Sequence, residues 1–293
     1  MIATAGPVRL AAPVSARRRA KDRAFTIFLW TCAAVAMLPL VLIVEYVVTK
    51  GAGVLSTGFF TREPAGPLDP ASGGIAPAFL GSGVIVGLAT LFSVPLGVLA
   101  AIYLAEYGRG RFAGVVRLVA EVLLSTPSII AGAFIWAILV VAMGSFSAIA
   151  GAVALTVLMW PVIARATEEI LRVVPQELRE GALALGLPRW KVILRVVVPT
   201  AGAGIVTSVM LAVARGLGET APLLLTTLGN DFLNVDPTKP TDAVPLRIYD
   251  YARTPVEALH AFAWGGALMF LVVVLALSIG ARVLSLRQRR RLA

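Results

Sequence analysis

Long apolar runs separated by short polar segments dominate the chain from residue 24 onward. A helix needs about 20 apolar residues to cross the hydrocarbon core of a membrane. Four runs are long enough for one span each: residues 24–44, 75–105, 196–230 and 258–281. The run 122–164 contains 43 residues without a charge. As a single helix it would be about 64 Å long, so it predicts two spans joined by a tight turn at residues 144–147. The pattern predicts an all-α integral membrane protein with six transmembrane helices.

Basic residues fall mainly in segments that six spans place on one side of the membrane. Twenty Lys and Arg residues lie on the side that holds both termini, five lie on the opposite side, and Arg215 lies within the fifth span. Cytoplasmic segments carry an excess of Lys and Arg, so both termini are predicted to be cytoplasmic. The first span could instead be a cleaved signal peptide. Its apolar run exceeds the usual length of about 7–15 residues, which disfavours that alternative.

Composition agrees with a polytopic membrane protein rather than a soluble enzyme, because 58% of the residues are apolar and 14% are charged. A net charge of +10 would suggest a nucleic-acid partner in a soluble protein. Here the one-sided loop charge explains it, and no nucleic acid is expected. Cys32 and His260 are the single cysteine and the single histidine. They exclude a disulfide within the chain and the usual His/Cys metal clusters.

Spans and polar segments together predict a division of the chain. Its parts are a basic cytoplasmic arm (1–23), a first transmembrane helix (24–48), an external loop (49–77), a permease-like core (78–283) that includes a polar loop (171–199), and a basic cytoplasmic tail (284–293).

The polar loop between the fourth and fifth spans predicts two short helices that meet at a glycine corner. Pro175 and Pro188 can each begin a helix, and Gly186 can end the first one. One small apolar face, at i, i+4 and i+7, holds Leu178, Ala182 and Leu185. Because this face is small and the surrounding charges are mixed in sign, docking into a groove of a partner protein is favoured. A hairpin that lies on lipid head groups is the alternative.

The same loop carries a spaced motif. Glu180-Gly181-Ala182 is followed after three residues by Gly186, and after nine more by Val196-Val-Val-Pro199. This spacing resembles the signature of ABC importer permeases with the type I fold, over about residues 75–285. Gly181 and the valines depart from the family's Glu-Ala-Ala and Ile-x-Leu-Pro. The resemblance implies a coupling helix that seats in a separate ATPase, and it implies that these residues contact that partner: Glu180, Ala182, Gly186, Leu187 and Pro188.

No ATPase motif is visible in the chain itself. A Walker A loop needs Gly-Lys-Ser/Thr so that backbone amides and a lysine hold the phosphates. The chain has four lysines, and none of them follows a glycine. We therefore expect no enzyme activity and no cofactor bound by this chain, with ATP and Mg²⁺ acting in the partner ATPase.

Arg215 and Glu219 are two charges within an apolar span. Such a residue costs at least about 2.5–3.5 kcal/mol in insertion experiments and is a functional candidate by default. One helical turn apart, the two side chains can pair. They then act either as a structural ion pair or as part of a translocation pathway. In a pathway, Arg215 would bind an oxyanion through forked hydrogen bonds and Glu219 would hold the guanidinium in place. Gly216 and Gly218 indicate a close helix contact or a close ligand approach beside them.

Residues 214–226 read Ala-Arg-Gly-Leu-Gly-Glu-Thr-Ala-Pro-Leu-Leu-Leu-Thr. This run resembles the phosphate-specific permeases, in particular the PstA type, and the runs 95–107 and 125–130 add to the resemblance. The PstC type shares Gly-Glu-Thr but usually not the residues after it. The resemblance implies that Arg215, Glu219 and Thr220 lie on a phosphate pathway. Thr126 and Ser128 either contribute hydroxyls to that pathway or bond to carbonyls freed beside Pro127.

The resemblance also implies an environment and a set of partners. It implies a multi-pass protein of the bacterial plasma membrane in an ATP-driven importer of inorganic phosphate. Its partners would be a PstC-type permease subunit, a dimer of ATP-binding subunits, an extracytoplasmic phosphate-binding protein and membrane lipid. A permease for another oxyanion or small solute is one alternative. An ATPase-independent secondary transporter is another, which would be expected to show repeats or ionisable groups in several spans.

Overall fold

The computed structural model describes residues 16–65, 69 and 72–292, with the backbone alone for residues 281 and 284–292. Residues 1–15 of the predicted arm and the side chains of the predicted basic tail lie outside the described residues. The chain divides into two compact units, residues 1–49 and residues 50–293.

Helix α1 (Ala16–Gly51) makes up the described part of the first unit. It begins at Ala16 rather than at residue 24, so the described end of the predicted basic arm is already helical. The mean hydropathy of its most apolar window is 2.6, which agrees with the predicted first span. Pro39 lies inside the helix, a position that membrane helices tolerate better than soluble ones.

The described part of the second unit is built from helices. They are η1 (Ala52–Val54), α2 (Thr57–Thr61), α3 (Ala76–Ile102) with the π-helical η3 (Tyr103–Tyr107), α4 (Arg111–Ser125), α5 (Ser128–Ile135), η4 (Trp136–Val140), α6 (Val141–Met143), α7 (Ala148–Val173), α8 (Gln176–Ala184), α9 (Arg189–Val192), η5 (Ile193–Val197), α10 (Val198–Leu217), α11 (Ala221–Thr226), α12 (Val244–Arg253) and α13 (Glu257–Leu292).

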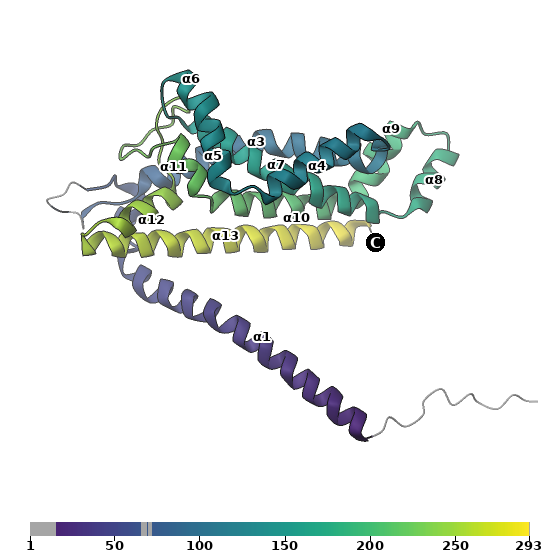
Figure 1. Cartoon of the computed structure of the whole chain (residues 1–293), viewed down its shortest axis with the longest axis horizontal. Helices are drawn as coiled ribbons and strands as arrows, with labels where there is room; N and C mark the ends of the chain where they lie inside the picture. The colour runs from purple at the N-terminus through teal and green to yellow at the C-terminus, as the bar shows by residue number, and fades with distance from the viewer. Residues whose placement is uncertain (1–15, 66–68, 70–71, 293) are drawn as a thin grey trace, which may run out of the picture. The chain divides into compact units, whose positions relative to one another are not determined.

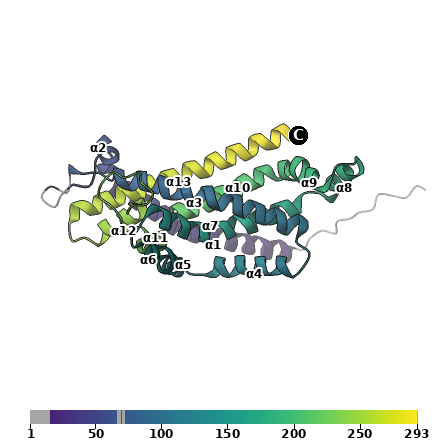
Figure 2. The ribbon, with the colours of Figure 1, turned by 90° about the horizontal axis from the view of Figure 1, so that it is seen from above.

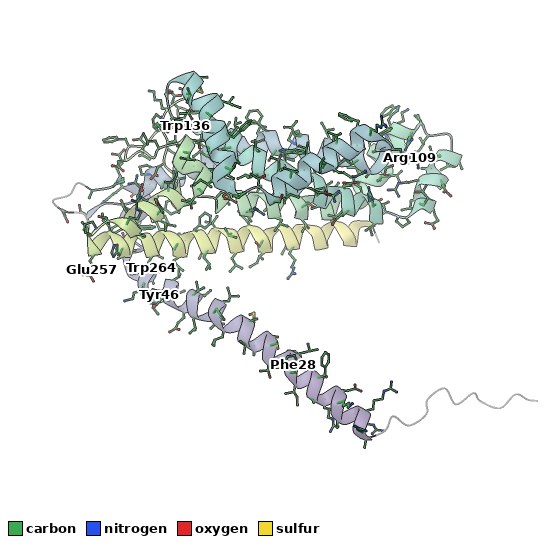
Figure 3. All side chains as sticks on the ribbon, viewed as in Figure 1. Phe28, Tyr46, Arg109, Trp136, Glu257 and Trp264 are labelled. Atoms are coloured by element: carbon green, nitrogen blue, oxygen red, sulfur yellow. The ribbon has the colours of Figure 1, made fainter. Side chains whose placement is uncertain are left out.

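Four long helices of this unit lie side by side: α3 packs on α7, α7 on α10, and α10 on α13 (Figures 1 and 2). Helices α8 and α9 lie at one end of them, here called the hairpin end. Helices α6, α11 and α12 lie at the opposite end, here called the loop end. Arg109 marks the hairpin end and Glu257 the loop end (Figure 3).

Small residues allow α3 and α7 to approach closely. A Cβ at Gly97 would lie 2.7 Å from the side chain of Ile163, so only glycine fits there. The Thr156 hydroxyl donates to the carbonyl of Ala89 at 3.4 Å and to that of Ala152 at 2.7 Å. Small side chains and hydroxyl bonds to the backbone are the usual means of packing helices in a membrane.

Six spans are confirmed when one bent helix pair is counted as a single span. Five helices are long and apolar enough to cross a membrane, and α4 together with residues 128–143 forms a sixth, bent by 107°. The third span was predicted to begin at Val122, but its helix begins at Arg111. The apolar pattern excluded the first part of α4 because it carries charges. In the structure, Arg117 and Glu121 pair with residues of α7.

The bend lies at Thr126 and Pro127. The residue before a proline is disfavoured in the helical region, and Thr126 is extended, with φ −72° and ψ 131°. Its hydroxyl donates to the carbonyl of Val122 at 2.7 Å, which confirms the predicted bond to a freed carbonyl. The predicted turn at residues 144–147 is also confirmed. Gly144 has φ +66°, and Ser147 caps α7 by accepting from the Ala150 N–H at 3.1 Å.

The loop end has a core of its own rather than an irregular surface. Phe59 on α2 is fully buried, with ring centroids 6.0 Å from Phe79 and 5.9 Å from Phe262. Helix α12 lies in the segment between the fifth and sixth predicted spans, where no helix was predicted. This packing places the ends of α3 and α13 against the same aromatic cluster.

Candidate substrate pathway and coupling hairpin

Arg215 lies in the last turn of α10, where the fifth span breaks. The Gly218 N–H donates to the Arg215 carbonyl at 3.0 Å, and the helix resumes only at Ala221. The run 196–230, predicted to hold the fifth span, therefore contains the end of one helix, a break and a second short helix. Pro222 explains the break, because it has no N–H to donate to the carbonyl of Gly218. Irregular backbone within a membrane is tolerated only where protein or a water-filled cavity surrounds it.

Arg215 and Glu219 form a loose ion pair across this break. The Arg215 Nε lies 3.6 Å from the Glu219 Oε1, which is longer than the 2.7–2.9 Å of a strong charge-assisted bond. The Arg215 side chain is 53% exposed and the Glu219 side chain 16%. Among the described residues the Arg215 guanidinium has no hydrogen bond. Glu219 can therefore orient the arginine while most of its donors stay available to an anion.

The break lies halfway along the neighbouring spans. A Cβ at Gly216 would lie 2.7 Å from the Met159 Sδ, and a Cβ at Gly218 would lie 3.8 Å from the ring of Phe270. Met159 is near the middle of α7, and Phe270 is near the middle of the apolar part of α13. The close helix contact predicted at Gly216 is confirmed, whereas Gly218 makes none.

The hydroxyl residues near the break differ in their surroundings. Thr220 is the N-cap residue of α11, but its side chain makes no capping bond. It follows Glu219 directly, as the pathway interpretation requires. The Thr126 hydroxyl is already bonded to its own helix. No hydrogen bond of the Ser128 side chain is found among the described residues, so Ser128 stays a candidate for the pathway.

Helix α11 is held in place by α5. A Cβ at Gly132 would lie 2.5 Å from the Cα of Pro222. Such an approach of backbone to backbone leaves room for glycine alone. The helix that follows the break at Pro127 is thereby packed directly against the helix that follows the break at Gly218.

The hairpin has the predicted architecture. Pro175 is the N-cap residue of α8 and Pro188 is that of α9. Gly186 lies between the two helices with φ +81°, a conformation that only glycine adopts at little cost.

Its side chains point in two directions. Leu185 is 84% exposed, and Leu178 and Glu180 are exposed as well, whereas Ala182 is only 8% exposed. Ala182 and the half-buried Leu187 pack in a cluster with Leu171 and Val192. The predicted apolar face is therefore divided. Ala182 packs the hairpin against the helices, whereas Leu178 and Leu185 are exposed.

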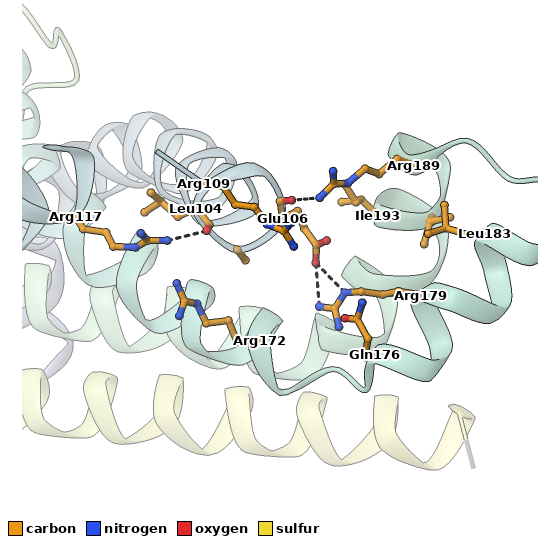
Figure 4. A pocket seen from close by; sticks show the side chains of 13 residues that line it. Leu104, Glu106, Arg109, Arg117, Arg172, Gln176, Arg179, Leu183, Arg189 and Ile193 are labelled. Atoms are coloured by element: carbon orange, nitrogen blue, oxygen red, sulfur yellow. Dashed lines mark hydrogen bonds and ion pairs between the residues drawn. The ribbon is translucent and has the colours of Figure 1, made fainter. Parts of the chain in front are cut away.

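A buried ion pair ties the hairpin to the end of α3 (Figure 4). Glu106, on the π-helical segment η3, accepts two bonds from Arg179 of α8 through its Oε1, at 2.9 and 3.1 Å. Arg179 also donates to the carbonyls of Leu171, at 2.7 Å, and Val174. From α9, Arg189 donates to the Glu106 carbonyl and lies 4.8 Å from the ring centroid of Tyr107. We call Glu106, Arg179 and Arg189 the hairpin clamp.

The family model for "Binding-protein-dependent transport system inner membrane component" matches residues 93–290, the part that contains both the break and the hairpin. The chain belongs to this family.

Relatives of the permease are named as phosphate transport proteins. It is 41% identical over 273 residues to "Phosphate transport system permease protein PstA" of Yersinia pestis, covering 93% of this chain and 92% of the relative. It is 45% identical over 237 residues to the PstA of Haemophilus influenzae, covering 80% and 83%. It is 40% identical over 285 residues to PstA 1 of Mycobacterium tuberculosis, covering 95% and 92%. The recognised resemblance to PstA-type permeases is confirmed.

Solved structures confirm the fold of the permease. A bacterial ABC transporter that imports the acidic polysaccharide alginate has a TM-score of 0.58 at 14% identity, over 90% of this chain and 99% of that one. The inward-facing MetNI methionine transporter has a TM-score of 0.58 at 19% identity, over 72% and 93%. The predicted ABC importer permease fold and the inner-membrane location are both confirmed.

Sequence reasoning missed the hairpin clamp of the permease. Glu106 and Arg179 are 73 positions apart, so no local spacing connects them. One signal was available: Glu106 is a lone acid at the end of an apolar run, on the side of the membrane that carries most of the arginines, so an arginine partner could have been expected. Sequence reasoning also missed the contact between Gly132 and Pro222, because a glycine within an apolar helix does not by itself indicate which helix it contacts.

A second missed cluster lies at the loop end. Arg247, on α12, bonds to Asp242 at 2.7 Å and to Asp231 at 2.6 Å. Burial raises the pKa of the Asp242 carboxyl to about 6, and the neighbouring guanidinium offsets only part of that effect. The Oδ1 of Asp242 has no hydrogen-bond partner within the part of the chain that is described, which agrees with the raised pKa. No three His, Cys, Asp or Glu side chains of the described residues are placed to hold a metal.

Proposed function

We propose that the permease is one of two unlike membrane subunits of an ATP-driven importer of inorganic phosphate, and that it forms half of the translocation pathway. The loose Arg215–Glu219 pair at the break of the fifth span carries this proposal. A guanidinium with unused donors suits a phosphate oxyanion. A carboxylate 3.6 Å away limits how tightly that anion is held, which a pathway residue requires.

The site residues in the pathway are Arg215, Glu219 and Thr220. The break brings two charges and a hydroxyl together about halfway along the neighbouring helices, with the Arg215 side chain 53% exposed. Broken helices take such a position in other transport proteins. The named phosphate permeases at 40–45% identity support phosphate as the solute.

The hairpin transmits the work of a separate ATPase. Glu180, Gly186 and Pro188 are exposed on it, and Leu185 and Leu178 offer apolar contact. Ala182 and Leu187 support this surface from behind. The chain hydrolyses no ATP and binds no cofactor in this proposal, because ATP and Mg²⁺ act in the ATP-binding dimer. The remaining partners are a PstC-type permease and an extracytoplasmic phosphate-binding protein.

The hairpin end is cytoplasmic in this proposal, with both termini on the same side. The excess of Lys and Arg at that end supports the orientation. Cysteine substitutions at Leu185 and at Phe232 of the loop end, probed with an impermeant thiol reagent on intact cells, test it. Labelling of Leu185→Cys without labelling of Phe232→Cys would reverse the orientation.

Uptake of labelled phosphate into vesicles that contain the assembled importer tests the pathway. Arg215→Gln is expected to reduce uptake strongly, to a residual level that can still be measured, and Arg215→Lys to reduce it less, because lysine keeps the charge without the forked donors. Arg253→Gln is the matched control, since Arg253 lies at the loop end and its side chain hydrogen-bonds, within the described part of the chain, to the Tyr249 hydroxyl alone. Unchanged phosphate uptake by Arg215→Gln, in a complex that assembles normally, would remove Arg215 from the pathway.

A further inference from the structure

A cavity of about 540 Å³ lies at the hairpin end, beside the hairpin clamp and apart from the Arg215 break (Figure 4). It is bounded by the loop before α4 and by helices α4, α7, α8 and α9. Each of these five segments contributes one guanidinium group to its wall: Arg109, Arg117, Arg172, Arg179 and Arg189.

Among the described residues, two carboxylates are bonded to these five groups, and both are already engaged. Glu106 is occupied by Arg179. Glu168 is 1% exposed and accepts from Arg117 at 2.9 Å and from Arg172 at 2.6 Å through the same Oε1. Its other oxygen bonds to Arg165 at 2.9 Å. The cavity therefore keeps a surplus of positive charge.

Arg109 adds a cation without any partner. No hydrogen bond or ion pair of its side chain is found in the part of the chain that the structure describes, and its side chain lines the cavity (Figure 4). Like charges that converge without a counter-ion repel each other, and an anion in the cavity would relieve that repulsion. Guanidinium groups match the geometry of phosphate oxygens.

We propose that this cavity binds an anionic phosphate group and that the bound anion joins the hairpin to the membrane helices. Arg117 and Arg172 belong to α4 and α7, whereas Arg179 and Arg189 belong to the hairpin. An anion between the two pairs bridges them. The phosphate group can come from an anionic lipid headgroup, which basic pockets between membrane helices recognise, or from free phosphate. The exposed apolar residues Phe112 and Val115 of α4 lie on the segment that follows Arg109.

Hydrogen exchange of hairpin amides 176–192 in the assembled, nucleotide-free transporter tests the proposal. One sample is held in nanodiscs of phosphatidylcholine, whose phosphate is paired with its own choline. A second has phosphatidylglycerol added to the same lipid. A third has inorganic phosphate added to phosphatidylcholine nanodiscs, with the ionic strength matched by chloride. An anion present at about ten times its dissociation constant slows exchange from the opened state about tenfold.

Slower exchange with phosphatidylglycerol identifies a lipid as the source, and slower exchange with inorganic phosphate identifies the free anion. Arg109→Gln is expected to raise the amount of anion needed for half-maximal slowing about tenfold, the worth of one charge-assisted hydrogen bond. Because the Arg109 side chain bonds to nothing in the described chain, its loss leaves no buried group unpaired. Arg111→Gln removes the same charge two residues away, outside the cavity, and should leave the slowing unchanged.

Equal exchange in all three samples would overturn the proposal, including the case in which a partner subunit fills the cavity with its own side chain. Equal effects of Arg109→Gln and Arg111→Gln would also overturn it, because the slowing would then reflect general surface charge. The measurement does not use transport, so its failure is distinct from a failure of the proposed pathway.

Discussion

Arg179 and Glu106 join the hairpin to the π-helical end of α3 through a single carboxylate oxygen, which accepts two bonds at 2.9 and 3.1 Å. The acid sits on a π-helical turn and the arginine on a short helix 73 positions later. Both side chains are largely buried, and Arg179 also holds two main-chain carbonyls at the end of α7. A force on the hairpin is therefore passed to α3 and α7 together.

Glu106→Gln is expected to weaken the coupling of ATP hydrolysis to transport. A hydrogen bond to a charged group contributes about 1.5–3 kcal/mol, and the amide that replaces the carboxylate keeps only part of it. The phosphate transported per ATP hydrolysed should fall about tenfold. The bond from Arg189 goes to the main-chain carbonyl of Glu106 and survives, so the hairpin should still assemble. Glu169→Gln, an exposed acid of α7, is the control, and an unchanged coupling ratio in Glu106→Gln would contradict this role of the clamp.

Arg215 and Glu219 are expected to act as one unit. Uptake is measured for Arg215→Gln, for Glu219→Gln and for the double variant. Residues in contact usually show coupling energies of about 0.5–3 kcal/mol in such cycles. The double variant should lose little more activity than Arg215→Gln alone, because Glu219 acts through the arginine, by orienting it and by limiting its hold on the anion. Strictly additive losses would show that the two side chains contribute separately.

Gly132→Ala and Gly216→Ala are expected to differ in their effect on stability. The new Cβ at position 132 would meet the Cα of Pro222 at 2.5 Å, whereas the one at 216 would meet the flexible end of Met159 at 2.7 Å. Backbone cannot give way as a methionine side chain can. Gly132→Ala should therefore destabilise the permease by about 1–3 kcal/mol or more, and Gly216→Ala by less. Thermal unfolding of the purified complex measures both, and a larger loss at position 216 would contradict the packing.

The two glycines of the hairpin should respond to alanine with opposite signs. Gly186 has φ +81°, which costs alanine about 1 kcal/mol or more. Gly181 lies within α8, and a Cβ added there would have no neighbour within 4 Å, so alanine should stabilise that helix by about 0.5–1 kcal/mol. Cleavage of the hairpin by a protease follows the population of its open form when opening is fast. Cleavage should be faster in Gly186→Ala and slower in Gly181→Ala than in the natural chain, and the reverse order would refute the assignment.

The loop end should become more stable as the pH falls. Asp242 has a pKa of about 6 in the fold against 3.8 when unfolded, because burial disfavours its charge. Its contribution is full below the unfolded pKa and is lost as the pH rises through 6. Lowering the pH from about 7 to about 5 should then stabilise this segment by about 1.4 kcal/mol, or tenfold in its opening equilibrium.

The amide of Val244 reports this opening, because it donates to the Ser82 hydroxyl at 2.9 Å. Its exchange, corrected for the intrinsic effect of pH, should slow about tenfold over that interval. Asp242→Asn should remove most of the dependence and leave the part due to Asp250, whose pKa is also raised by burial. Faster corrected exchange at the lower pH would mean that the ion pair with Arg247 outweighs burial.

Hydropathy predicted the long helices well and their interruptions poorly. The span predicted at residues 75–105 matches α3 and its π-helical end closely, because the run begins after Gly73 and Gly74 and ends at the charged Glu106. The run 122–164 carries no charge, so hydropathy could not detect the bend at Pro127. The break after Leu217 was not predicted for a related reason. It depends on the missing backbone donor of Pro222, which does not change hydropathy.

The hairpin was predictable because its ends depend on single residues. Pro175, Gly186 and Pro188 act through their own backbone angles, which a sequence displays directly. The division of its side chains was not predictable, since burial of Ala182 depends on helices α3 and α10 that the local spacing does not describe. The same limit applies to Arg247, which pairs with acids in a segment where no helix was expected.

The contact between Gly132 and Pro222 has a consequence for how the membrane interior is divided. Each of the two short helices follows a non-helical link, and backbone touches backbone where they meet. Neither can be displaced toward the other without a collision. A shift of either short helix, α5 or α11, toward the other would therefore have to carry its neighbour with it, beside the continuous helices α3, α7 and α13.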